Sequence, residues 1–170
     1  KILIQIGATN TTYNPLNFID PNRIVPSEKD KYFRYSTLKG YVHDMGAAMQ
    51  GGIGGHAGLF SNANDVAKIM QMFLQRGYYG GKRFFNESTF DLFNTCYFCD
   101  LGNRRGLGFD KPEMDDSMST CGCVPKSSFG HSGFTGSYTW ADPKNKIVYV
   151  FLSNRTYPSM ENNLLSEHNI

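Results

Sequence analysis

The sequence predicts an α+β fold in which a loop-rich segment precedes a C-terminal three-stranded antiparallel meander packed with helices. Three observations lead to this prediction. The first forty residues are rich in Pro, Asn, Asp and Tyr without a sustained hydrophobic period, the middle has apolar residues at helical spacing, and the last third has strand-like runs between short turns. Because 170 residues suffice for one core, we expect residues 1–170 to form a single domain or part of one.

The middle of the chain contains the clearest helical pattern. Ser61 or Asn62 is expected to cap a helix, because their side-chain oxygens can accept the free N–H groups of its first turn. Gly77 is expected to end this helix, and four apolar residues recur at helical spacing before it: Ala67, Met70, Phe73 and Leu74. A short helix is also expected within residues 42–49.

A second helix is expected to begin at the cap Asn86 and to bury Phe90 and Phe93. The glycine-containing segment 78–85 before it predicts a turn or a small hairpin. Residues 105–110 are expected to form a short strand, which an irregular loop follows.

The last third of the chain predicts the meander. Residues 128–134, 137–141 and 147–153 are strand-like, and the last run is rich in β-branched and aromatic residues. Short turns join them, as in antiparallel hairpins. A helix is expected to begin within residues 159–170, and Trp140 is most simply a core residue, with an aromatic sugar-binding platform as the alternative.

Composition excludes some function classes. The formal net charge is +2 and no basic run is interleaved with aromatic residues, so nothing favours a nucleic-acid partner. The apolar runs are far shorter than the roughly 20 residues of a membrane-spanning helix, so no such segment is expected in this chain.

Four cysteines form a C-x-x-C pair, Cys96 and Cys99, and a C-x-C pair, Cys121 and Cys123. Three interpretations compete: structural zinc, disulfides and free thiols. The C-x-C spacing is too tight for the usual zinc knuckle, which argues against metal. The spacing does not determine a disulfide pairing, and no neighbouring base or positive field marks a reactive thiol.

The sequence "FGHSGFTGSYTW" places His131, Ser132 and Gly133 in a row at the end of an expected strand. A lone histidine on a strand is more often structural than catalytic. A donor side chain, a hydroxyl and a residue without a side chain are, however, what a hydrolase needs to bind a carboxylate and leave the strand edge open. A peptide-like substrate can add to such an edge, and a backbone N–H just beyond the glycine can face an oxyanion.

Three stretches carry a resemblance to a known family. "GHSGFTGSYTWADPKNKIVYVFLSNRTYP" resembles the last third of the serine β-lactamase and penicillin-binding-protein superfamily, which includes D-alanyl peptidases and class C-like esterases. "GGIGGHAGLFSNANDVAKIMQMFL" is similar to the glycine-rich segment and following helix of the same superfamily. "RIVPSEKDKYFRYSTLKGYVHDMGAA" is similar to members fused to family-3 glycoside hydrolases in bacteria. The resemblance implies part of a β-lactamase/transpeptidase-like fold.

The resemblance also implies roles for individual residues. His131 takes the place of the third-box lysine as the catalytic donor, Ser132 binds a substrate carboxylate or carbonyl, and Gly133 lets the substrate approach. Phe134 offers its backbone N–H as half of an oxyanion hole. An imidazole in place of lysine suits an esterase, an amidase or a D-alanyl peptidase as well as a β-lactamase.

The superfamily's nucleophile lies in a Ser-x-x-Lys box at a helix start, and a Tyr-x-Asn or Ser-x-Asn box supplies its partner. Neither Tyr-x-Asn nor Ser-x-Asn occurs in this sequence. The one Ser-x-x-Lys, "STLK" at residues 36–39, is followed directly by Gly40 and lacks an apolar helical stripe, so we interpret it as chance. We therefore expect the nucleophile outside this chain, and a C-terminal fragment that is inactive by itself and prone to self-association.

His43 and Asp44 in "VHD", and His56 in "GGHAG", could be metal ligands or loop-anchoring hydrogen-bond partners. No third ligand has suitable spacing, which favours hydrogen bonds. In the related fused proteins these segments border the cleft, so the resemblance makes His56 a candidate substrate-binding residue.

The sequence thus predicts part of a bacterial serine hydrolase that acts through an acyl-enzyme on a peptide, ester or β-lactam carbonyl in cell-wall metabolism. It would work outside the cytoplasm, without a metal or other cofactor, on a peptide or cell-wall-derived small molecule. The alternative is a non-catalytic wall-binding or interaction module that retains the fold.

Overall fold

A computed structural model describes residues 1–113 and 124–168, which form two compact units. The first, here the sheet unit, comprises Lys1–Ala8, Val66–Ser132 and Tyr138–Phe151. The second, the loop unit, comprises the remainder: Thr9–Asp65, Gly133–Ser137 and Leu152–Ile170. The single-domain expectation stays a prediction, and each unit is described by itself.

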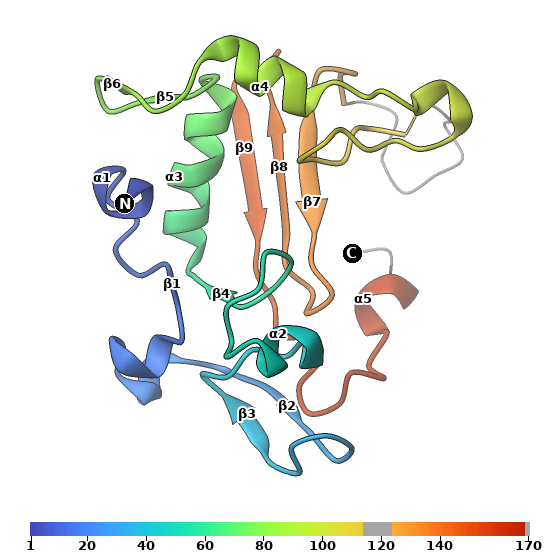
Figure 1. Ribbon diagram of the computed structural model, residues 1–170. Helices are drawn as coiled ribbons and strands as arrows, with labels where there is room; N and C mark the ends of the chain where they lie inside the picture. The colour runs from blue at the N-terminus through green and yellow to red at the C-terminus, as the bar shows by residue number, and fades with distance from the viewer. Residues whose placement is uncertain (114–123, 169–170) are drawn as a thin grey trace. The chain divides into compact units, whose positions relative to one another are not determined.

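The sheet unit contains the predicted meander. Strands β7 (Phe129–Ser132), β8 (Tyr138–Asp142) and β9 (Ile147–Phe151) pair antiparallel in the order β7-β8-β9 (Figure 1). Strands β7 and β9 are shorter than predicted, and β8 has the predicted length but begins one residue later. The chain leaves the β7–β8 ladder after Ser132 and forms a separate turn before Tyr138.

Helix α3 (Ala63–Leu74) follows the predicted cap: the Asp65 N–H donates to Asn62 Oδ1 at 2.9 Å. The segment after it forms the predicted hairpin, β5 (Tyr78–Tyr79) with β6 (Lys82–Arg83). Helix α1 (Ile2–Gln5) lies at the start of the chain and was not predicted.

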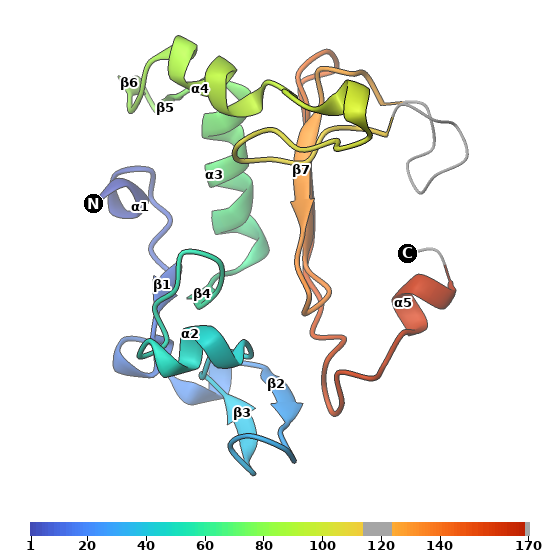
Figure 2. The same ribbon diagram turned by 45° about the vertical axis from the view of Figure 1, so that its right-hand side comes forward.

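Helix α4 (Glu87–Asn94) begins after Asn86, as predicted, and lies near the C-terminal end of α3 (Figure 2). Phe90 is buried, but the prediction that Phe93 is buried too is wrong, because 47% of it is exposed. Phe90 packs edge-on against Phe129, with 5.1 Å between the ring centres, whereas the Phe93 ring lies beside Gly108, which has no side chain to cover it.

The core of the sheet unit surrounds Phe129, which is fully buried, as is Ala141; Met70 and Phe90 are buried beside them. Trp140 is 7% exposed and belongs to the buried core residues, as predicted. Residues 105–110 do not form the predicted strand: a single bridge joins Arg105 to Asp110, and a 3-10 turn, η3 (Cys99–Leu101), precedes it.

The loop unit is loop-rich, as predicted for the first forty residues. Its regular elements are short: β1 (Thr12–Tyr13), η1 (Pro15–Asn17), η2 (Pro21–Arg23), β2 (Pro26–Lys29), β3 (Thr37–Lys39), α2 (Met45–Met49), β4 (Leu59–Phe60) and α5 (Leu164–Glu167). Strands β1 and β4 form one antiparallel pair, and β2 and β3 form another. The "STLK" stretch lies on and next to β3, which confirms that it is not on a helix.

No helix in the described ranges, 1–113 and 124–168, is both long and apolar enough to cross a membrane.

Candidate active site

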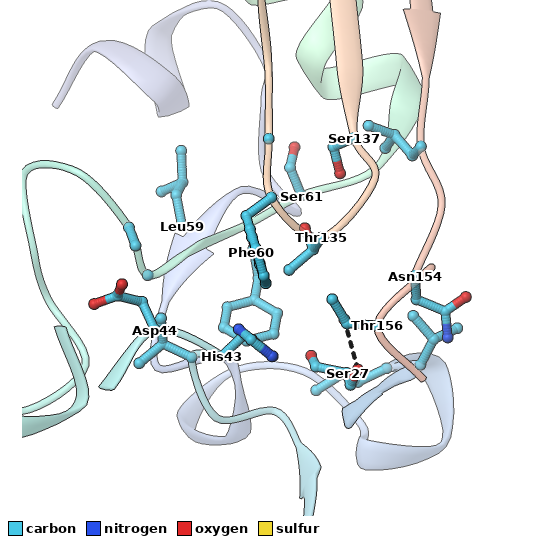
Figure 3. A pocket seen from close by; sticks show the side chains of 18 of the residues that line it. Ser27, His43, Asp44, Leu59, Phe60, Ser61, Thr135, Ser137, Asn154 and Thr156 are labelled. Carbon is cyan, nitrogen blue, oxygen red and sulfur yellow. Dashed lines mark hydrogen bonds between the residues drawn. The ribbon is translucent and has the colours of Figure 1, made fainter. Parts of the chain in front are cut away.

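A pocket of about 820 Å³ opens in the loop unit (Figure 3). Its size falls in the range of small-molecule sites. The walls combine hydroxyl groups with apolar side chains, including Ser27, Ser61, Thr135, Phe60, Leu59 and Phe134. Three separate parts of the sequence meet there: residues 10–62, the turn at 133–137 and residues 152–160.

The turn that follows the His-Ser-Gly sequence forms one wall of this pocket. The Gly133 N–H donates to Ser137 O at 2.6 Å, and the Gly136 N–H donates to Gly133 O at 2.9 Å. Gly136 has a φ of +92°, and a Cβ there would lie 2.2 Å from Ser153 Oγ, so only glycine fits. The Phe134 ring is 61% exposed.

His131 and Ser132 lie on β7 in the sheet unit, where both are exposed. His131 Nδ1 lies 2.6 Å from Ser132 O, and His131 Nε2 lies 3.4 Å from Arg105 Nη1. A guanidinium only donates, so Nε2 accepts and Nδ1 carries the hydrogen. An imidazole in that form has no formal charge, and the positive charge beside His131 is therefore that of Arg105.

Asp110 holds this arginine. Arg105 Nε lies 3.1 Å from Asp110 Oδ1, and Arg104 Nη2 lies 3.6 Å from Asp110 Oδ2. Asp110 is 3% exposed and its backbone pairs with Gly130 on β7. The carboxylate thus fixes two cations next to the strand that carries the His-Ser-Gly sequence.

His56 and Asp44 interact in the loop unit. Asp44 Oδ1 lies 2.9 Å from His56 Nε2 and accepts the Ala47 N–H of α2 at 2.7 Å. Hydrogen bonds lower the pKa of Asp44: the largest effect comes from the Ala47 N–H and the next largest from His56. This geometry confirms the hydrogen-bonding interpretation of the pair, and His56, 57% exposed in its side chain, lines the pocket. Within the described ranges no three metal-binding side chains come together.

His43 lies deeper, beside the buried carboxylate of Glu28. His43 Nε2 and Glu28 Oε2 are 3.0 Å apart but do not have hydrogen-bond geometry. Glu28, 2% exposed, instead accepts the Tyr32 hydroxyl at 2.7 Å and the Met160 N–H at 3.1 Å. Burial, reinforced by Glu28, raises the pKa of Tyr32 to about 12, so this hydroxyl keeps its proton.

Arg34 and Asp30 fix the backbone that carries His43. Arg34 donates to Val42 O at 2.6 Å and to His43 O at 2.8 Å, and its Nε lies 3.2 Å from Asp30 Oδ2. Burial by itself would raise the pKa of Asp30, but the N–H groups of Phe33, Tyr32 and Arg34 hold it well below its usual range. The backbone of His43 is therefore held by Arg34, which is itself paired with the buried Asp30.

Cys96 and Cys99 form a disulfide in the sheet unit, which confirms the disulfide interpretation for this pair. Cys121 and Cys123 lie outside the described residues. The disulfide borders a smaller pocket that also contains Lys111. Burial lowers the pKa of Lys111 to about 8, and its ammonium donates to Asn94 Oδ1 at 3.1 Å.

Sequence reasoning missed Glu28, Arg34, Arg105 and Arg155. Arg105 has no motif that marks it, because its partner His131 lies 26 positions away. Glu28, Arg34 and Arg155 did have a signal, since they belong to stretches on which the resemblance rests.

The chain is similar to several known proteins. The family model for β-lactamase matches residues 5–168. A protein of Escherichia coli K12 named "Putative D-alanyl-D-alanine carboxypeptidase" is 36% identical over 170 residues, which covers 92% of this chain and 39% of the relative. A Salmonella agona protein of the same name is 33% identical with the same coverage.

A crystal structure of a β-lactamase from Mycobacterium bovis matches 67% of this chain and 47% of its own, at 21% identity and a TM-score of 0.43. The chain spans about 39% of the length of the curated relatives it matches. Since the family model covers nearly the whole chain, the chain belongs to the β-lactamase family.

Proposed function

We propose that this chain is part of a bacterial serine hydrolase of the D-alanyl carboxypeptidase type, which forms an acyl-enzyme on a peptide, ester or β-lactam carbonyl outside the cytoplasm. Family membership and the names of the curated relatives support the class of enzyme. No cofactor is part of this mechanism.

The observation that carries the proposal is the arrangement around the His-Ser-Gly sequence. Ser132 presents an exposed hydroxyl at the end of β7, and Arg105 beside His131 supplies the positive charge that a substrate carboxylate needs. In this proposal His131 orients Arg105 and the His-Ser-Gly sequence. Ser132 binds the substrate carboxylate or carbonyl, and Gly133 lets the substrate approach.

The Phe134 N–H, two positions after Ser132 in the sequence, is the proposed oxyanion donor. In the part of the chain that the structure describes, this N–H donates to no other group, while the neighbouring Gly133 N–H is used within the turn. A free N–H directly after the box is suited to an oxyanion. In the loop unit, the hydroxyl-lined pocket, which the exposed His56 also lines, suits a peptide or cell-wall-derived substrate.

The nucleophile and its lysine are proposed to lie outside this chain. The Ser-x-x-Lys of residues 36–39 lies on and beside β3, where the serine and lysine do not share a helical face. The chain by itself would then be inactive. It would also self-associate, because β9 pairs only with β8 among the described strands and leaves an edge to which a second copy could add.

Covalent labelling tests the proposal. A fluorescent penicillin and a fluorophosphonate are added to this chain and to the full-length protein, and the adducts are mapped by mass spectrometry. The expected result is an adduct on the full-length protein alone, on a serine outside residues 1–170. Labelling of Ser36 in this chain would overturn the assignment of the nucleophile, and no label on either protein would favour the wall-binding module.

A further inference from the structure

Phe134 needs to be held in place by its neighbours. Its ring is 61% exposed, and it follows Gly133 in a turn that also contains Gly136, so neither burial nor local stiffness fixes it. An oxyanion donor is effective only when it is already in position before the charge develops. The residues that hold Phe134 therefore determine whether its N–H can stabilise an oxyanion.

Arg155 contacts Phe134 in two ways. Its guanidinium carbon lies 4.6 Å from the centre of the Phe134 ring, and its Nε donates to Phe134 O at 2.8 Å. The Arg155 backbone N–H also donates to Thr135 O at 3.0 Å, within the same turn. Arg155 thus holds the Phe134 ring, the Phe134 carbonyl and the next residue, Thr135.

Arg155 is itself anchored by backbone carbonyls. Its Nη1 donates to Met160 O at 3.0 Å and to Asn162 O at 2.7 Å. Among the described residues it has no carboxylate partner, so its charge is turned toward carbonyls and toward the Phe134 ring. Such a planar fork with several donors is what arginine provides and lysine does not.

His43 provides the second contact. Its ring centre lies 5.5 Å from that of Phe134, with the planes tilted by 35°. Glu28 lies 3.0 Å from its Nε2, and Arg34 fixes its carbonyl. Because the Nε2 of His43 is not hydrogen-bonded, the ring acts through its position and its packing.

We propose that Arg155 and His43 are positioning residues that hold Phe134 so that its backbone N–H points at the reacting carbonyl. This inference rests on the proposed function of that N–H as an oxyanion donor. Neither residue is required to touch the substrate.

Steady-state kinetics of ester hydrolysis by the full-length protein test the inference. Arg155→Gln is expected to lower kcat by about 10- to 100-fold, less than or equal to the loss of an oxyanion donor. KM should change by less than roughly threefold, because the interaction is made in the transition state. A raised KM with unchanged kcat would overturn the inference, since it would mean substrate contact.

A pair of substitutions at His43 keeps the test decisive if Arg155→Gln does not fold. His43→Ala removes the ring and should lower kcat, whereas His43→Phe keeps a ring against Phe134 and should restore most of it. Equal loss in both variants would contradict a packing role. The matched control is Arg83→Gln, because Arg83 also donates to backbone carbonyls, those of Arg76 and Phe85, but on the hairpin of the sheet unit.

A readout independent of activity separates this inference from the proposed function. In ¹⁵N NMR spectra, the Phe134 amide resonance should shift in Arg155→Gln and in His43→Ala, and should stay unchanged in Arg83→Gln. If the full-length protein neither labels nor hydrolyses esters, the proposed function fails, and the amide still decides whether these two residues hold Phe134. An unmoved amide in both variants would overturn the inference.

Discussion

The two units of this chain are stabilised by different interactions. The sheet unit is built on aromatic packing: Phe129 is fully buried, and Phe90 and Phe109 lie 5.1 Å and 4.9 Å from it. The loop unit buries charge instead, with Glu28 and Asp30 each 2% exposed and Arg34 tied to backbone carbonyls. Apolar packing is non-directional, whereas hydrogen bonds fix the position and direction of individual groups, which is what a site made of loops requires.

The largest expected effect is in the aromatic core. Phe129→Ala should destabilise the protein by about 3–5 kcal/mol, because it removes a fully buried ring and leaves a cavity. Phe93→Ala is the matched control, since Phe93 is 47% exposed, and it should cost clearly less. Urea unfolding followed by Trp140 fluorescence measures both, and equal losses would contradict the assignment of Phe129 to the core.

A smaller effect is expected in the charged network. Arg34→Ala should cost about 2–3 kcal/mol, because it leaves the Val42 and His43 carbonyls without this donor and removes the cation beside the buried Asp30 carboxylate. Arg34→Lys should recover only part of this loss, because an ammonium cannot bond both carbonyls and Asp30 at once. Full recovery in the lysine variant would show that charge alone matters there. Hydrogen exchange of the residue 42–44 amides gives a local measurement.

The lowered pKa of Asp30 predicts that the loop unit loses stability at acid pH. Its pKa is lowered in the folded state, so between that value and the ordinary value of about 4 the unfolded chain binds more protons. Its stabilising contribution is therefore present above about pH 4 and is lost as the pH falls further. Asp30→Asn should flatten this part of the stability curve. The same acid dependence in the variant and the wild type would contradict the assignment.

The lowered pKa of Lys111 predicts that the stability of the sheet unit also rises with pH, here in the alkaline range. Its pKa is lowered to about 8, so between pH 8 and the ordinary value of about 10.4 the unfolded chain again binds more protons. Stability from this group should rise with pH across that window. Lys111→Met removes the dependence and leaves the remaining curve unchanged, as thermal unfolding at pH 7.5, 9 and 10 would show; a persistent rise would contradict it.

The sequence by itself determined the elements that depend on local chemistry. Asn62 caps α3 because its side chain reaches the first turn, the paired glycines at 80 and 81 close a hairpin, and β-branched and aromatic runs form the meander. The order of motifs also identified the family. These features are encoded within a few consecutive residues, so they can be recognised without neighbours in space.

Only the tertiary structure decided which side chains support the site. The His-Ser-Gly sequence was recognised, but the cation beside it, Arg105, is 26 positions away from His131. Arg155 reaches back 21 positions to Phe134, and Glu28 meets the Met160 N–H across 132 positions. Phe93 was wrongly placed in the core for the same reason, since helical spacing shows which side a residue lies on but not what covers it. Hydrogen bonds and ion pairs depend on distances between atoms, and folding alone brings distant residues to those distances.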